Sequence, residues 1–249
     1  MRNSLRKMRY ILNTFQNVSR SSEQETGNMI TQNFLKTKSR HHQVDASIVN
    51  YGDRHKEFFV KKNLSKTCFN INLLSSHSLS AGSIQSIVDS YKQDVLVINI
   101  DNTYNINTGK LPKLTQAYIN VILDAFEKKP TKKEKTLADS NLIYIGIDNF
   151  EASQTIRYFP TYTSAINTFI KSHPAKYIHI SCNIAYMYEG IGLSNPHDLR
   201  CKHIKKIIKT AKPRLVGFDF TGIPYSIGNK KQTRLTLCNI NNVLNKVIE

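Results

Sequence analysis

The residues that could do chemistry in this chain occur singly, each just after a predicted strand. They are His77 and the segments 101–108, 148–154, 183–188 and 219–225. No GxGxxG or GxxxxGK[ST] motif follows a strand, so the backbone phosphate cradles of nucleotide-binding folds are absent. No GxSxG nucleophile elbow occurs either. The cysteines show no CxxC spacing and no neighbouring base, and we expect Cys182 to be a small buried residue rather than a nucleophile.

The elements that would position these residues are short runs rich in Val and Ile, alternating with longer segments of helical periodicity. The clearest buried strand is 95–101, whose unbroken apolar run is typical of a strand covered on both faces. We also predict strands at 10–15, 70–74, 142–147, 177–181 and 214–220, and helices at 83–91, 115–128, 161–172, 200–212 and 232–247. Such β–α alternation predicts a single α/β domain with a parallel sheet, whose ligands bind at the carboxyl ends of the strands.

The segment 101–108 (DNTYNINT) resembles the arginase (ureohydrolase) family, whose members carry Asp-Ala-His-Thr-Asp-Ile-Asn-Thr after the same apolar strand. Further segments resemble the family in the same order: 49–53, 77–84, 144–147, 178–181 and 215–219. Residues 9–14 and 25–27 sit where the family has its first strand and a Glu-Glu-Gly-Pro turn. The resemblance spans residues 1–249, most weakly over 1–47. It implies a single-domain, three-layer arginase-like fold with a central parallel sheet flanked by helices.

The same resemblance implies six metal-ligand positions, most of which are changed in this chain. In the family they hold two Mn²⁺ ions, and the hydroxide that bridges the ions attacks a guanidinium carbon. The positions fall at His77, Asp101, Thr103, Asn105, Asn183 and Ala185. Only His77 and Asp101 keep a competent group, because Mn²⁺ prefers carboxylate and imidazole ligands. We therefore predict no metal site, no cofactor and no catalytic residue.

The positions on the substrate side are changed as well. Asn107 matches an Asn of the family, whereas acidic positions fall at Asn149, Glu151 and Gly222, of which only Glu151 keeps a carboxylate. Neutral residues would let an empty pocket exist without repulsion between clustered carboxylates. We expect His77 to cap or hydrogen-bond within its loop, and Asp101 to accept backbone N–H groups of the following turn.

The chain carries 35 Lys and Arg against 18 Asp and Glu, a formal charge of +17. Lys128–Lys135 is typical of a solvated loop. A second cluster, residues 200–214, contains no acid and places isoleucines at helical spacing, which predicts an amphipathic helix with a basic outer face. We expect that face to be solvated, and its alternative role is a nucleic-acid surface formed by Lys202, Lys205, Lys206, Lys209 and Lys212.

Residues 1–22 contain basic residues and serines and no acid, which is the composition of a mitochondrial transit peptide. Against that interpretation, a cleaved leader would discard the strand predicted at 10–15, and the family resemblance favours the strand. No run of 18 apolar residues occurs, so we expect no membrane-spanning helix. We predict an intracellular, cytoplasmic protein, with a mitochondrial location as the alternative.

These observations together predict a catalytically inactive, metal-free arginase-like pseudoenzyme that acts as a structural or protein-interaction module. Its partner would be another protein or its own kind, since the family commonly assembles as trimers. One alternative is a basic structural subunit associated with RNA or a ribonucleoprotein. Another is a divergent ureohydrolase that acts on a guanidino substrate through His77 and Asp101.

Overall fold

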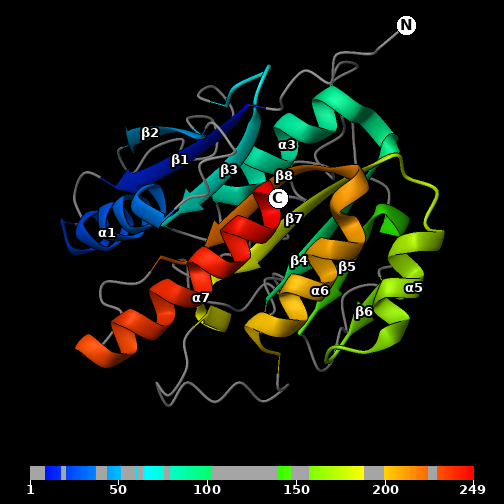
Figure 1. Ribbon diagram of the computed structural model, residues 1–249. Coiled ribbons are helices and arrows are strands. Elements are labelled where there is room, and N and C mark those ends of the chain that lie inside the picture. The colour runs from blue at the N-terminus through cyan, green and yellow to red at the C-terminus, as the bar shows by residue number, and fades with distance from the viewer. Residues whose placement is uncertain are drawn as a thin grey trace, which may run out of the picture.

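The computed structural model describes residues 9–17, 21–37, 44–51, 60, 64–75, 79–101, 139–146, 157–187, 199–223 and 229–249. Eight strands in these residues form one sheet in the order β2-β1-β3-β8-β7-β4-β5-β6 (Figure 1). Every neighbouring pair is parallel. The strands are β1 (Tyr10–Asn17), β2 (Val44–Tyr51), β3 (Phe69–Leu74), β4 (Val95–Ile100), β5 (Leu142–Ile145), β6 (Arg157–Phe159), β7 (Tyr177–Asn183) and β8 (Leu215–Thr221). The predicted α/β class with a parallel sheet is confirmed.

Helices cover both faces of the sheet. The described residues contain α1 (Ser21–Thr37), α3 (Ser80–Tyr91), α5 (Ser164–Ser172), α6 (Cys201–Ala211) and α7 (Lys230–Ile248). Helices α5, α6, α7 and α1 lie side by side in that order over one face, and α3 packs against β4, β7 and β8 (Figure 1). Short 3₁₀ turns occur at Lys92–Asp94, Asp139–Asn141, Ile184–Met187 and Lys212–Arg214. None of the described helices combines the length and the apolar character needed to cross a membrane.

The main hydrophobic core lies between the sheet and the layer of α5, α6 and α7. Because strand side chains alternate between faces, every second residue of the central strands enters this core, as Ile98, Ile180 and Phe218 do. All six residues of β4 are buried, as the continuous apolar run predicts. The residues of the same strands that face α3 include many polar side chains, so the two faces of the sheet differ in chemistry.

The predicted isoleucines attach the basic helix α6 to the sheet. Ile204, Ile207 and Ile208 are buried and lie on one side of the helix, which leaves the lysines on the other side. Asn229 caps the N-terminus of α7, and its side-chain oxygen accepts the backbone N–H groups of Lys231 and Gln232, each at 3.1 Å. These local signals explain why both helices form where the sequence predicts them.

Most predicted elements agree with the structure to within a few residues. The strand predicted at 10–15 is β1, which pairs with β2 and β3, so residues from Tyr10 onward belong to the sheet. Cys182 is fully buried inside β7, as expected, and burial raises the pKa of its thiol well above its usual value. Residues 25–27, which align with a turn of the arginase family, lie within α1 instead. The helix predicted at 115–128 and the loop Lys128–Lys135 lie outside the described residues.

Candidate functional site

Three of the predicted site residues come together at the carboxyl edge of the sheet, where β4 and β7 end. Ile100 pairs with Cys182, so Asp101 and Asn183 follow side by side. Asn183 Nδ2 donates to Asp101 Oδ1 at 3.0 Å, and both side chains are buried. The backbone N–H of Ala185 donates to Asn183 Oδ1 at 2.9 Å. This second bond fixes the orientation of the Asn183 amide. If the amide were flipped, its NH₂ group would face the N–H of Ala185, and two donors would meet.

The hydrogen bond from Ala185 also explains how the chain leaves β7. An Asn side chain that accepts the N–H two residues later makes an Asx turn, which here opens the 3₁₀ turn Ile184–Met187. That turn brings the Tyr186 hydroxyl over the end of β5. Gly146 has a φ of 99°, and a side chain there would meet the Tyr186 hydroxyl and, at 2.8 Å, the Asp101 carbonyl oxygen. Only glycine therefore allows Tyr186 to reach this place.

Burial around Asp101, and the charge of Asp101 itself, disfavour ionisation of the neighbouring Tyr186 hydroxyl. Burial, and secondarily the charge of Asp101, raises the pKa of Tyr186 well above the usual value of 10, so its hydroxyl stays protonated. Asp101 also donates its backbone N–H to the Ile145 carbonyl at 3.0 Å, which ties it to β5. The Asn183 amide thus binds the carboxylate, and the neutral Tyr186 hydroxyl lies within range of its charge.

The remaining predicted positions are divided between this edge and the undescribed residues. Gly222 directly follows β8, whose Thr221 pairs with Asn183, so Gly222 lies at the same edge and offers no side chain. Six positions lie outside the described residues: His77, Thr103, Asn105, Asn107, Asn149 and Glu151.

The described residues do not fit a divalent cation. Across the described part of the chain, no group of three or more His, Cys, Asp or Glu side chains could hold a metal. At the edge itself, the carboxylate of Asp101 accepts an amide N–H of Asn183, and such a donor cannot ligate a cation. Ala185 supplies a backbone donor rather than a ligand. The described residues of this edge thus form a hydrogen-bonded cluster of one carboxylate, one amide and one backbone N–H group.

Sequence reasoning missed a buried hydrogen-bond network inside the sheet, on the face that α3 covers. His179 Nε2 lies 3.0 Å from Asp219 Oδ2, and both side chains are fully buried. Asp219 Oδ1 accepts Asn72 Nδ2 at 2.7 Å and Ser83 Oγ at 3.0 Å. Because the aspartate lies between the serine and the histidine, and no member is exposed, this is no Ser–His–Asp hydrolase triad. Its role is to hold β3, β7, β8 and α3 together.

The network belongs to a row of polar side chains that crosses six adjacent strands. Register pairs join Asn13 to Asn72, Asn72 to Asp219, Asp219 to Ser181, Ser181 to Asn99, and Asn99 to Tyr144. All of these residues are buried. The available sequence signal was a single polar residue inside an apolar strand, such as His179 between Ile178 and Ile180.

The lysines predicted for the basic helix differ in exposure. Lys202, Lys206 and Lys209 are exposed, and Lys205 is half-buried. Lys212 donates to the Val247 carbonyl at the end of α7. Burial, and secondarily the charge of a neighbouring lysine, lowers the pKa of Lys212 to about 8. Lys212 thus serves the packing of α7, whereas the exposed lysines remain open to solvent.

No family model matches the sequence, and no curated protein matches it. Solved structures match along nearly the whole chain. The agmatine ureohydrolase of Thermoplasma volcanium has 14% identity and a TM-score of 0.66, over 97% of this chain and 91% of that one. The arginase of Entamoeba histolytica has 14% identity and a TM-score of 0.67, over 97% and 99%. The formimidoylglutamase of Bacillus subtilis has 13% identity and a TM-score of 0.65, over 97% and 88%. This chain therefore has the arginase-like ureohydrolase fold.

Proposed function

We propose that this protein uses the arginase fold without arginase chemistry. It binds no pair of manganese ions, releases no urea from guanidino compounds, and acts as a structural or protein-interaction module. The observation that carries this proposal is the hydrogen bond from the Asn183 amide to the Asp101 carboxylate. The family resemblance assigns both positions to metal ligands, whereas here the two side chains bond to each other.

The chemistry of the edge residues supports the loss of hydrolysis. A hydroxide that bridges two divalent ions needs several carboxylate ligands to offset the charge of the ions. Of the four carboxylates that the resemblance implies, Asp101 alone is retained, and it accepts the Asn183 amide. Ala185 and Gly222 bring no side-chain oxygen to this edge. The neutral set removes the repulsion that clustered carboxylates would suffer without cations.

An interaction role is supported by what the chain retains. The complete eight-stranded sheet is present although the ligand positions are changed. Its edge strand β2 carries Ile48 with 52% of the side chain exposed, and Met29 of α1 is 36% exposed. An edge strand with exposed apolar residues suits contact with another chain. We propose a second copy of this chain as the first partner to test, in a trimer as the family resemblance implies, with an arginase-like subunit as the alternative.

The direct test measures metal and urea with the full chain. The protein is incubated with excess MnCl₂, dialysed, analysed for bound manganese, and assayed for urea release from arginine and agmatine. We expect less than one tenth of an equivalent of manganese and no urea above the buffer blank. Two bound manganese ions together with urea release would refute the proposal and establish a divergent ureohydrolase.

Light scattering coupled to size exclusion tests the interaction role. A mass two or three times that of one chain, reduced by Ile48→Lys, would support self-association. A monomer at all concentrations up to 100 μM would refute self-association and leave another protein as the partner, to be sought by cross-linking.

A further inference from the structure

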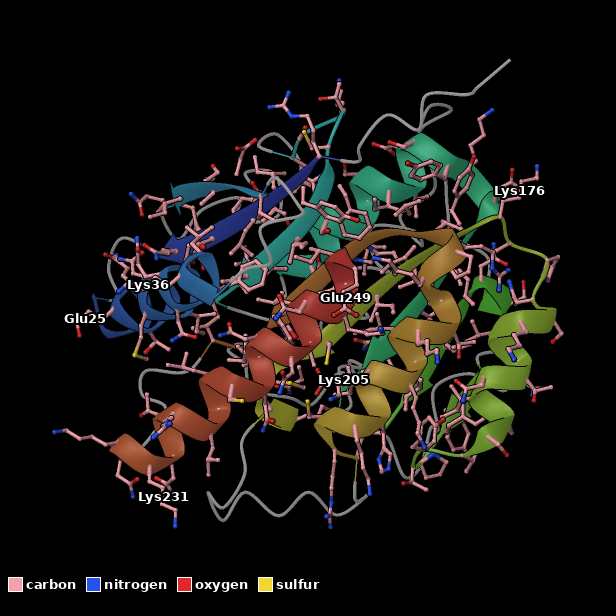
Figure 2. All side chains as sticks on the ribbon, in the orientation of Figure 1. Glu25, Lys36, Lys176, Lys205, Lys231 and Glu249 are labelled. Carbon is pink, nitrogen blue, oxygen red and sulfur yellow. The ribbon has the colours of Figure 1, made fainter. Side chains whose placement is uncertain are left out.

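Among the described helices, positive charge is concentrated on one layer. Helices α5, α6 and α7 contain nine Lys and Arg residues, one in α5 and four in each of the others, and no Asp or Glu. On the other face of the sheet, α3 contains one aspartate and no basic residue. Figure 2 shows Lys205 on α6 and Lys231 at the start of α7 within this layer. We refer to the outer surface of α5, α6 and α7 as the basic layer.

The exposed lysines of α6 form the centre of the basic layer. Lys202, Lys206 and Lys209 are spaced by four and three residues, so they form one stripe along about 10 Å of helix. Lys206 Nζ also lies 5.5 Å from the centre of the Tyr162 ring, in the segment that precedes α5. Each lysine repels its neighbours, because no acid of the same helix lies within reach. A polyanion would remove that repulsion.

Several other cations of this region are already used within the fold. Arg214 donates to the carbonyls of Ile170, His173 and Ala175, and Lys246 pairs with Glu249 at 2.7 Å. These two side chains stabilise the C-terminal ends of helices and the segments that follow them. By contrast, the exposed α6 lysines contribute little to packing, because the buried side of the helix is formed by isoleucines. Their charges are thus available to a partner.

We propose that the basic layer binds structured RNA through its phosphate backbone. A membrane surface fits less well, because the apolar side of α6 is buried and Leu235 alone among the large hydrophobic residues of α5, α6 and α7 is exposed. Duplex DNA is read by an element that enters its deep major groove. Helix α6 instead lies flanked by α5 and α7 within a layer (Figure 1). Such a surface suits the wide, shallow minor groove of A-form RNA.

A groove at the margin of the basic layer extends this surface. It has a volume of about 630 Å³ and is lined by one side of α7 and by Asn33 of α1. Lys230 and Arg234 bring charge to it, and the amide of Asn245 also lines it. Amides donate to and accept from the 2′-hydroxyl groups that distinguish RNA from DNA. No aromatic side chain lines the groove among the described residues, so binding would follow the backbone rather than stacked bases.

The test uses the full chain and a fluorescein-labelled 20-base-pair RNA duplex, with anisotropy measured between 50 and 300 mM KCl. The triple variant Lys202→Gln, Lys206→Gln and Lys209→Gln is expected to bind at least about tenfold more weakly and to lower the slope of log K against log salt by roughly 2 to 3. Replacing the same three lysines by arginine should preserve the affinity to within about threefold, because the charge is kept.

The matched control removes the same charge elsewhere. Lys66, Lys92 and Lys176 precede β3, β4 and β7, and Lys176 lies at the far edge of the molecule from Lys231 (Figure 2). Changing all three to Gln should alter RNA affinity by less than about threefold. An equal loss in this control would show that net charge alone drives binding and would refute the proposal. Equal affinity for a DNA duplex of the same sequence, or preferential binding to anionic vesicles, would refute the assignment to RNA. Circular dichroism verifies that each variant is folded.

Discussion

The cluster of Asp101, Asn183 and Ala185 makes a quantitative prediction about the substitution Asn183→Asp. The change is nearly isosteric, so it alters charge rather than packing. It replaces the N–H donor 3.0 Å from Asp101 Oδ1 by a second carboxyl group. At that distance two ionised carboxylates would repel by about 5 kcal/mol at an effective dielectric constant of about 20. One of the two groups therefore keeps a proton in the folded protein.

The cost of keeping that proton sets the size and the sign of the effect. Binding a proton at pH 7 to a carboxyl group with an ordinary pKa of about 3.9 costs about 4 kcal/mol, at 1.36 kcal/mol for each pH unit. The pKa of the pair is raised in the folded state, so stability is highest below the unfolded pKa and falls as pH rises toward the raised value. The variant should lose about 4 kcal/mol at pH 7 and about 1.5 kcal/mol at pH 5.

Urea unfolding of the wild type and the variant between pH 5 and 7 measures this difference. Asn242→Asp, on the exposed side of α7, adds the same charge and should change stability by less than about 0.5 kcal/mol. A loss for Asn183→Asp that is below 1 kcal/mol and independent of pH would refute the direct contact with Asp101. An increase in melting temperature with added Mn²⁺ would show that one carboxylate restores a metal site, against the proposed function.

Three further predictions concern buried and half-buried groups. Asp219→Ala should destabilise the protein by about 3 to 5 kcal/mol in urea unfolding, because His179 and Ser83 lose their acceptor and Asn72 loses one of two acceptors, and a loss below 1 kcal/mol would contradict the buried network. In the native state at pH 8, a thiol reagent should modify the exposed Cys238 quickly and the buried Cys182 only on unfolding, as peptide mapping will show; rapid labelling of Cys182 would contradict its burial. The folded pKa of Lys212, about 8, lies below its unfolded value, so the wild type should gain stability relative to Lys212→Gln as pH rises from 8 to 10, and a difference independent of pH would contradict that shift.

The fold was largely predictable because its signals are local. The strand 95–101 and the helix 200–212 are set by unbroken and periodic apolar runs, and the structure has β4 at Val95–Ile100 and α6 at Cys201–Ala211. Helix α1 was not predicted, because its sequence mixes Ser, Thr, Gln and Asn with few apolar residues. Tertiary contacts stabilise it instead, through the buried Ile30 and Phe34.

The candidate site was predictable only in part, because contacts between strands depend on register. The resemblance to the ureohydrolases assigned Asp101 and Asn183 to one site, but it did not indicate that they hydrogen-bond to each other. The pair of His179 and Asp219 was harder to find, since 40 residues separate the two and each lies within a strand predicted to be apolar. A charged or ionisable residue in a buried strand, such as Asp219, should be treated as half of a pair, because leaving it unpaired would cost several kcal/mol.

The charge of +17 has two separate physical origins, and they lead to different expectations. Five positions that are acidic in the resembled family are neutral here: Asn105, Asn149, Asn183, Ala185 and Gly222. Restoring all five acids would lower the charge only to +12. The basic layer alone holds nine positive charges and no negative one within its helices, and these helices cover one face of the sheet. The five neutral positions therefore cannot explain the basic layer, because neutral residues at a candidate site give no reason to collect lysines on helices. A chain that had merely lost catalysis would keep a surface of mixed charge, since clustered like charges destabilise the folded state. A negatively charged partner would therefore explain why the helices of the basic layer carry clustered positive charge.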